Sequence, residues 1–447
     1  MSSVLRHPLA AVAATTGLTL PWIYLWATGS AESLPTLWVV AISGIAVLGA
    51  SFLLAWGAET AEKDVPRAFA IAVLAVLAVA PEYAVDALYA WTAGANVGTP
   101  RGAEAANLAV ANMTGANRIL IGLGWSGIAL FTIYRAQSAS DPAVESRSGL
   151  LANVVHLDRD ISTEITFLLA ATAYAFLVPL RDGIGILDTV VLVGIYLLYI
   201  AVIVRGDVEE HEQQVGVPAY FHRYPRGGRV AVVLTLFVYS GAMIYTAVHP
   251  FAHGLELLGT ELGIPAFFMI QWIAPLASES PELIVVAYLV NKARSTAGFN
   301  ALISSKLNQW TLLIGTLAVV YSIAAGEVGH LPFDFKQSAE IWITAAQSFF
   351  ALAVLVNFTI SAREAVALLV LFVSQVAIEF LLIRDLVSLP FGIGTIEVLL
   401  GYTVVYLVLG TVLFVARRDG LRELLDRTAH TAQDAFGSGQ TQAERAD

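Results

Sequence analysis

The sequence predicts an all-α protein that crosses a membrane about twelve times, as two inverted repeats of five helices with one extra helix at each end. The first observation is composition: 57% of the 447 residues are hydrophobic and 13% are charged. Many apolar stretches also reach the roughly 20 residues that span a bilayer. The second is the alternation of basic residues between successive loops, and the third is a pair of similar motifs in two oppositely oriented halves.

Twelve apolar stretches are predicted as membrane-spanning helices. The first stretch is followed by no convincing small-residue cleavage site, so we expect it to be retained as a helix. The predicted spans are 8–27, 35–57, 67–91, 104–134, 162–180, 184–204, 229–249, 264–290, 297–324, 338–360, 363–384 and 397–416.

The basic residues of the loops predict the orientation. Eighteen of the 24 Lys and Arg residues fall on one side, two lie inside spans, and the other side has only Arg101, Arg181, Lys336 and Arg384. The positive-inside rule then places both termini in the cytoplasm. A net charge of −11 argues against a nucleic-acid partner. Acidic loops with little lysine suit a high-salt or high-GC prokaryote. We expect the protein to lie in the plasma membrane.

Two glutamates are the first candidate functional residues. Glu82 and Glu282 lie 200 residues apart, and each follows a proline, Pro81 or Pro281, in the middle of an apolar stretch. A carboxylate near the bilayer centre costs several kcal/mol, so it is usually retained for an ion, a proton or a partner charge. The adjacent proline removes a backbone hydrogen bond and exposes carbonyl oxygens at the same depth. The pattern indicates an internally duplicated ion transporter.

A second match follows each glutamate. Asn117 and Gly124 align with Asn308 and Gly315, and five spans separate equivalent positions, so the halves are inverted. The tail is polar and is expected to be disordered beyond a short helix. The predicted layout is an extra helix within 1–30, a first repeat at 35–204, a cytoplasmic linker at 205–229, a second repeat at 230–384, an extra helix at 397–416 and a cytoplasmic tail at 417–447.

The Pro-Glu turns and the Asn…Gly stretches resemble the motifs of the cation/calcium exchanger superfamily, whose sodium/calcium exchanger membrane region has two inverted five-helix repeats. The resemblance covers roughly residues 35–384. It implies a secondary antiporter that exchanges Na⁺ or H⁺ for Ca²⁺ or another cation by alternating access. It also implies no cofactor besides the transported cations, with inorganic cations and the lipid bilayer as partners. Glu82 and Glu282 would then bind the transported metal ion.

The chain also departs from that family's motifs. Val79 and Glu279 stand where a small polar residue is expected three positions before the motif glutamate. Arg118 and Gln309 stand where the family has an ion-ligating Asn or Asp. The resemblance therefore implies the fold and leaves the transported ion open.

Further candidate ion-binding residues lie beside the two glutamates. Asp86 is one helical turn after Glu82, and Glu279 is three positions before Glu282, so each pair shares a helical face. Oxygen-rich sites of this kind suit hard cations. The complete predicted ion-binding set is Glu82, Asp86, Asn117, Glu279, Ser280, Glu282, Asn308 and Gln309.

Arg118 and Lys306 are predicted to compensate this negative charge. With the four carboxylates ionised, the two bases leave a balance of −2, which one divalent ion, two monovalent ions or two protons would neutralise. The alternatives are that the acids and bases form a buried structural lock, and that Lys306 extends to the cytoplasmic interface. We expect Arg118 to pair with Glu82, with Asp86 or with a carboxylate of the other repeat.

Other interpretations follow from the same residues. A Na⁺/H⁺-type or other-solute exchanger is the alternative within transport. An intramembrane enzyme is less favoured because no nucleophile and base set stands out and the chain has no cysteine. His249 and His253 have metal-ligand spacing, but an exposed helix extension is the preferred interpretation. We also expect Glu82 and Glu282 to face each other on antiparallel helices broken near their prolines. Transport direction, stoichiometry and oligomeric state stay open.

Overall fold

The computed structural model describes residues 7–65, 80–138, 141–205 and 216–443. Almost all of these residues are helical, and eleven of the described helical segments are long and apolar enough to cross a membrane. They correspond to eleven of the twelve predicted spans. The remaining one, 67–91, lies partly outside the described residues, and its described portion begins α5 at Ala80. The predicted all-α polytopic fold is confirmed.

The helices divide into two parts. The first part comprises residues 1–89 and 210–281, and the second comprises 90–209 and 282–447. Each part contains segments from both predicted repeats. The elements of the first part are α1 (Pro8–Thr28), η2 (Ser30–Ser33), α2 (Thr36–Ala61), α10 (Gly216–Phe221), α11 (Arg226–Leu262) and the first portions of α5 (Ala80–Ala95) and α12 (Ala266–Asn291).

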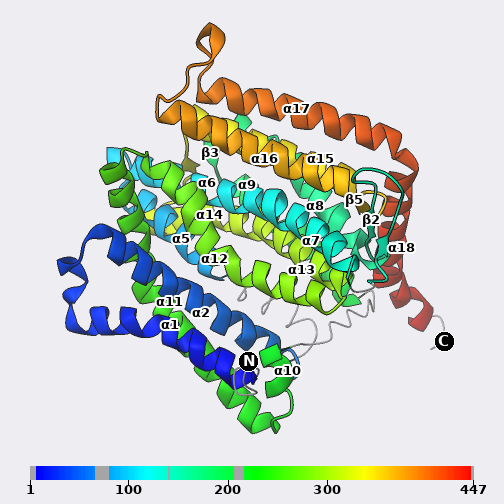
Figure 1. Cartoon of the computed structure of the whole chain (residues 1–447), viewed down its shortest axis with the longest axis horizontal. Coiled ribbons are helices and arrows are strands. Elements are labelled where there is room, and N and C mark those ends of the chain that lie inside the picture. Colours follow the sequence, from blue (N-terminus) through cyan, green and yellow to red (C-terminus); the bar gives the residue numbers. More distant parts are fainter. Residues whose placement is uncertain (1–6, 66–79, 139–140, 206–215, 444–447) are drawn as a thin grey trace. The chain divides into compact units, whose positions relative to one another are not determined.

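In the first part, α2 packs along α11 and against α1 (Figure 1). The residue Asp64, just beyond α2, fixes the start of α11. Both of its carboxylate oxygens accept hydrogen bonds from Arg229, at 2.6 and 2.8 Å. These hydrogen bonds lower the pKa of Asp64 from its ordinary value. The helix α11 extends well beyond the predicted span 229–249, and it ends where Gly263 adopts a left-handed conformation.

The second part holds most of the chain. Its elements are the end of α5, α6 (Pro100–Ile119), η4 (Leu120–Trp125), α7 (Ser126–Ala136), η5 (Arg159–Ile161), α8 (Ser162–Ala175), η6 (Val178–Leu180), α9 (Ile186–Arg205), the end of α12, α13 (Ser295–Asn308), η7 (Gln309–Leu313), α14 (Ile314–Ala325), α15 (Phe335–Leu355), α16 (Ala362–Ile383), η8 (Pro390–Gly392), α17 (Thr395–Ala416) and α18 (Arg418–Ala443). The helix α15 packs against α6, α8 and α17.

Two π-helical segments interrupt long helices at matching places. The segment η4 joins α6 to α7, and η7 joins α13 to α14. Each comes after the aligned asparagine of its repeat, Asn117 or Asn308. A π-helical turn adds a residue to the helix and often marks a functional position. The predicted correspondence of these two stretches therefore extends to their backbone conformation.

Short strands connect some helices of the second part. In one sheet, β2 (Val154–His156) pairs antiparallel with both β1 (Val144–Glu145) and β5 (Thr359–Ser361). In the other, β3 (Gly183–Ile184) pairs with β4 (Leu331–Pro332). The strand β5 lies directly before α16, so the predicted span 338–360 is too long at its end. In the structure α15 ends at Leu355.

The C-terminal tail differs from its prediction. The sequence predicted a short helix followed by disorder, whereas α18 continues to Ala443 and packs against α8 and α9. Leu424 is fully buried, and Thr428, one turn later, is hydrogen-bonded to Thr166 of α8 at 2.8 Å. The reason is amphipathicity: buried residues on one face of a polar helix provide enough contact to order it.

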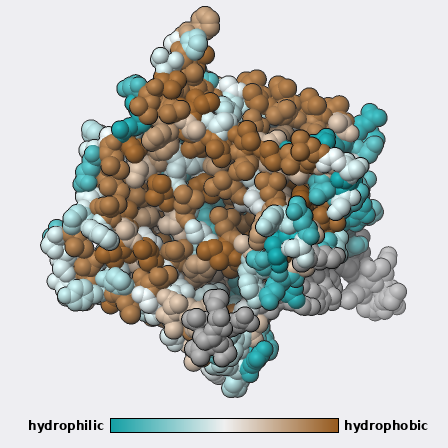
Figure 2. All heavy atoms as spheres, in the orientation of Figure 1, coloured by the Kyte–Doolittle hydropathy of each residue, from teal (hydrophilic) through white to brown (hydrophobic). Residues whose placement is uncertain are grey.

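The surface of the second part is apolar over two of its helices. In Figure 2, hydrophobic residues cover the exposed face over α16 and α17, and hydrophilic residues gather toward α18 and the β1–β2 loop. The exposed apolar side chains of α16 and α17 include Val370, Val373, Val404, Val408 and Val412. Such a surface is the one expected of helices in a bilayer.

We expect Gly122→Ala to destabilise the protein, because a Cβ at this position of η4 would lie 2.3 Å from Cγ of Phe372 on α16. Overpacking of this kind typically costs about 1–3 kcal/mol. Gly127→Ala is the control, since a Cβ there has no neighbour within 4 Å. The measurement is the thermal unfolding midpoint in detergent. An equal midpoint for the two variants would contradict the close packing of α16 on η4.

Candidate functional site

Two predicted ion-binding carboxylates lie on one face of α5. Glu82 and Asp86 are separated by one helical turn, and both are buried. Tyr89 continues the same face, and its hydroxyl donates a hydrogen bond to Oε1 of Glu256 on α11, at 2.7 Å. Within the first part, this contact holds the face that carries the carboxylates close to α11.

The predicted break at Pro281 is wrong. The helix α12 runs without interruption from Ala266 to Asn291, with Pro275 and Pro281 inside it. The hydroxyl of Ser280 donates to the carbonyl of Leu276, one turn earlier. Pro281 removes the backbone donor for the carbonyl of Ala277, one residue after Leu276, and the helix continues despite this loss. Glu279 is buried in this stretch.

In the second part, Glu282 of α12 contacts the next helix of its repeat. Its Oε2 accepts a hydrogen bond from the hydroxyl of Ser305 on α13, at 2.9 Å. Ser305 is buried and directly precedes Lys306. Sequence reasoning did not name Ser305 as a site residue, although it stands in the motif before Asn308.

Lys306 is buried and points into the protein. Its Nζ donates to Oδ1 of Asn117 at 2.6 Å and lies 3.3 Å from the backbone oxygen of Asn117. The same ammonium lies 4.3 Å from the centre of the Trp310 ring. The alternative in which Lys306 extends to the interface is therefore wrong. A fixed positive charge from one repeat contacts the site asparagine of the other.

Asn308 and Gln309, the other two predicted amides, are both buried where α13 meets η7. The hydroxyl of Thr311 donates to the carbonyl of Leu307 at 2.6 Å. The two amides therefore lie at a place where the regular helical hydrogen bonds change to the π pattern.

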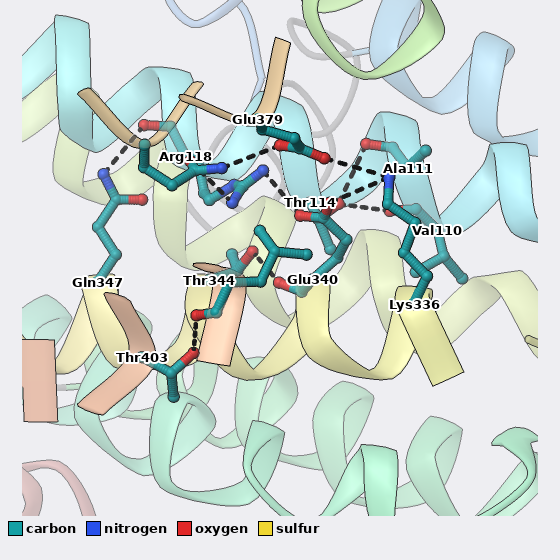
Figure 3. Close-up of polar contacts among 12 residues, drawn as sticks. Val110, Ala111, Thr114, Arg118, Lys336, Glu340, Thr344, Gln347, Glu379 and Thr403 are labelled. Atoms are coloured by element: carbon teal, nitrogen blue, oxygen red, sulfur yellow. Dashed lines mark hydrogen bonds and ion pairs between the residues drawn. The ribbon is translucent and has the colours of Figure 1, made fainter. Parts of the chain in front are cut away.

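Arg118 takes part in a group of buried polar side chains that we call the charge ring: Arg118, Glu340, Lys336, Glu379 and Gln375. Its Nη2 lies 2.8 Å from Oε2 of Glu340 on α15, and its Nη1 donates to Oε1 of Gln375 on α16 at 3.2 Å. Figure 3 shows the guanidinium between α15 and α16. The prediction that Arg118 pairs with a carboxylate of the other repeat is confirmed, and Glu340 is that carboxylate.

Sequence reasoning missed Glu340, Glu379 and Lys336. Lys336 was assigned to an outer loop, but its side chain is only 17% exposed and forms ion pairs with both glutamates. The signal was present: each glutamate lies inside a predicted apolar span, as Glu82 and Glu282 do. The cost of a carboxylate inside an apolar span applies to all four, although Glu340 and Glu379 lie nearer the ends of their spans.

The histidine pair lies on an exposed helix extension, which is the interpretation that the sequence favoured. His249 and His253 are exposed on α11, with ring centres 6.0 Å apart. Among the described residues, no group of three or more His, Cys, Asp and Glu side chains is arranged to hold a metal ion. The approach of Glu82 to Glu282 stays a prediction, because the two residues belong to different parts of the molecule.

Comparison with known proteins identifies the family. The model of the family described as sodium/calcium exchanger protein matches residues 35–205 and 232–381. This chain belongs to the sodium/calcium exchanger family. The matched ranges contain all ten predicted site residues and the whole charge ring. No curated protein gives a significant match.

Solved structures agree with this assignment. The structure described as the H⁺/Ca²⁺ exchanger CAX is 41% identical, with a TM-score of 0.83, and the match covers 95% of this chain and 98% of that one. The structure of native YfkE has a TM-score of 0.58 at 14% identity, over 82% of this chain and 100% of that one, and supports the fold alone. The chain is therefore a multi-span cation antiporter and not an enzyme.

Removal of the Arg118 guanidinium should strongly destabilise the protein, because Glu340 would keep only the Lys336 ammonium, 3.6 Å away. Breaking a buried ion pair typically costs about 3–5 kcal/mol. We expect Arg118→Met to lower the thermal midpoint more than the double variant Arg118→Met/Glu340→Met, which leaves no uncompensated carboxylate.

The control for this prediction is Arg427→Ala, which removes an exposed pair with Glu423 on α18. Exposed pairs contribute at most about 1 kcal/mol. If Arg118→Met lowered the midpoint no more than Arg427→Ala, the assigned role of the Arg118–Glu340 pair would be wrong.

Proposed function

We propose that this protein exchanges Ca²⁺ for H⁺ across the membrane, with Glu82 and Glu282 binding the transported cations in turn. Carboxylates in a membrane interior bind either a hard cation or protons, and both neutralise the cost of the buried charge. The 41% identity to a protein described as an H⁺/Ca²⁺ exchanger supports this pairing of ions.

The observation that carries the proposal is the position of the Lys306 ammonium. Its Nζ lies 2.6 Å from the side-chain oxygen of Asn117 and 3.3 Å from the backbone oxygen. A bound metal cation is coordinated by several oxygens. Here the Lys306 ammonium, which is a fixed positive charge, already contacts two such oxygens of Asn117. A free monovalent cation at the same oxygens would have to displace the ammonium or lie close to it, and two like charges at that distance repel each other. We infer that this chain has fewer Na⁺ sites than a Na⁺-driven exchanger and couples Ca²⁺ to protons.

The membrane orientation completes the proposal. The excess of basic residues in alternate loops supports cytoplasmic termini, and we place the protein in the plasma membrane of a prokaryote. Both ions would then be exchanged between the cytoplasm and the exterior by alternating access. The alternative, a Na⁺/H⁺-type or other-solute exchanger without a calcium site, is an outcome of the experiments below.

Exchange should require both motif glutamates. In proteoliposomes, a pH gradient should drive Ca²⁺ uptake by the wild type, and a Na⁺ gradient without a pH gradient should not. Glu82→Gln and Glu282→Gln each remove a carboxylate that binds the cation. We expect at least about a tenfold loss of flux, the factor that corresponds to 1.4 kcal/mol.

Glu104→Gln is the matched control, because Glu104 is an exposed carboxylate near the start of α6. It should transport Ca²⁺ at the wild-type rate. Full flux in a Glu82→Gln/Glu282→Gln double variant would refute the role of the glutamates. Proton flux driven by Na⁺, without any Ca²⁺ transport, would favour the alternative exchanger.

Lys306→Met tests the proposed exclusion of Na⁺. The variant keeps an unbranched side chain of similar length but removes the charge that contacts Asn117, so the oxygens of Asn117 become available to a free cation. We expect external Na⁺ to inhibit or drive Ca²⁺ flux in Lys306→Met and to have little effect in the wild type. Equal responses to Na⁺ in both proteins would show that the ammonium does not determine ion selectivity.

A further inference from the structure

The five side chains of the charge ring form a closed series of contacts between three helices. Figure 3 labels four of them: Arg118, Lys336, Glu340 and Glu379. Arg118 of α6 contacts Glu340 at 2.8 Å, and Glu340 lies 3.6 Å from the Lys336 ammonium, both on α15. Lys336 lies 3.2 Å from Oε1 of Glu379 on α16. The amide of Gln375 closes the series: it donates to Oε2 of Glu379 at 2.9 Å and accepts from Arg118 at 3.2 Å. With all four charged groups ionised, the ring is neutral.

The two carboxylates of the ring are not equivalent. Glu340 forms ion pairs with two cations, Arg118 and Lys336. Glu379 forms an ion pair with Lys336 and accepts a hydrogen bond from the neutral amide of Gln375, and the Arg118 guanidinium attracts it through space. A charged donor stabilises a carboxylate more than a neutral amide does. The orientation of the amide is also set, because its oxygen accepts from Arg118. A proton entering the ring therefore binds Glu379 in preference to Glu340.

The ring reaches the molecular surface at one end. Lys336 is the second residue of α15 and is 17% exposed, whereas the side chains of Arg118, Glu340 and Glu379 are at most 1% exposed. The predicted topology assigns Lys336 to the outer side of the membrane. A proton would therefore reach Glu379 from the exterior, past the ammonium.

The elements around α16 add few other ionisable groups near Glu379. The helix α15 contributes only Lys336 and Glu340, and η4 with α7 contributes Tyr134 and Arg135 at the far end of α7. On α17, Glu397 is an exposed carboxylate in the first turn, Tyr402 donates a hydrogen bond to Ser374 at 2.8 Å, and Tyr406 is buried. On α6 the remaining ionisable side chains, Arg101 and Glu104, lie at the opposite end of the helix from Arg118.

We propose that Glu379 is a proton-binding site for the external solution, separate from the motif glutamates, and that its protonation slows exchange. Protonation converts a neutral ring into one of charge +1 and removes the nearer of the two anionic partners of Lys336, at 3.2 Å, which leaves Glu340 at 3.6 Å. The ring holds α6 against α15 and α16, and Arg118 directly follows Asn117, which contacts Lys306. The excess charge therefore arises in a ring that includes Arg118, the sequence neighbour of the asparagine in the proposed cation pathway. The proposal that Glu379 binds a proton does not depend on the proposed function. The proposal that this proton slows exchange does rest on it.

Infrared titration of the purified full-length protein tests proton binding directly. Between mildly alkaline and mildly acidic buffer, a buried carboxyl that gains a proton shows a new C=O stretching band. We expect wild type and the control Glu104→Gln to share a band that is absent in Glu379→Gln and present in Glu340→Gln. An unchanged band pattern in Glu379→Gln would overturn the proposal.

Lys336→Met provides a second variant if Glu379→Gln does not fold. Without the ammonium, Glu379 loses the cation that favours its ionised form, so its carboxyl band should persist to more alkaline buffer than in the wild type. A ring that acts only as a structural lock would show no band that moves with this substitution. An unmoved band in Lys336→Met would therefore also contradict the proposal.

Flux measurements separate regulation from coupling. With internal pH fixed, Ca²⁺ flux through the wild type should fall as the external solution is acidified, beyond the change in driving force, and Glu379→Gln should lose that additional dependence. The reversal potential should be the same in both proteins, since Glu379 is not a transported-proton site. A changed reversal potential would overturn the regulatory assignment. If the wild type carried no Ca²⁺ flux but kept the infrared band, the proposed function would fail while the proton site stood.

Discussion

Pairing of buried charges is the constraint on which the second part of the molecule depends. A guanidinium and two carboxylates, at most 1% exposed, lie between helices that face a bilayer. An unpaired charge in that environment is far more costly than one at a water-exposed surface. Arg118 therefore requires Glu340, and Glu379 requires Lys336 and Gln375. These contacts fix which faces of α6, α15 and α16 meet, and Lys306 on Asn117 fixes α13 against α6 in the same way.

Small residues and π-helical turns let these helices approach closely. In lipid, apolar surface alone gives helices little reason to associate, so small residues and polar contacts carry more of the specificity. Phe372 of α16 lies against Gly122 within η4, where any larger residue would collide with the ring. The two π segments, η4 and η7, follow the aligned asparagines of the two repeats. The same stretches that interrupt the helices therefore present the predicted site residues.

The sequence predicted the helices well and the partners of the site residues poorly. Hydropathy located the described spans, and the Pro-Glu and Asn…Gly motifs located residues of both repeats that are buried in the structure, such as Asn117, Gln309 and Glu279. Glu340 and Glu379 were missed because they belong to no repeated motif, and Lys336 was missed because a helix start resembles a loop in composition. The order of α18 was missed because its contacts with α8 are distant in sequence.

The sequence by itself determined that this chain is an all-α membrane protein with a duplicated motif, because span length and repeated motifs are properties of local sequence. The expectation of an antiporter came from the resemblance of those motifs to the exchanger superfamily. Only the tertiary structure decided what each buried charge contacts. Arg118 and Glu340 are more than 200 residues apart in the sequence, and so are Arg118 and Gln375. No local pattern specifies such pairs. They follow from the packing of distant helices, and burial makes every one of those contacts necessary.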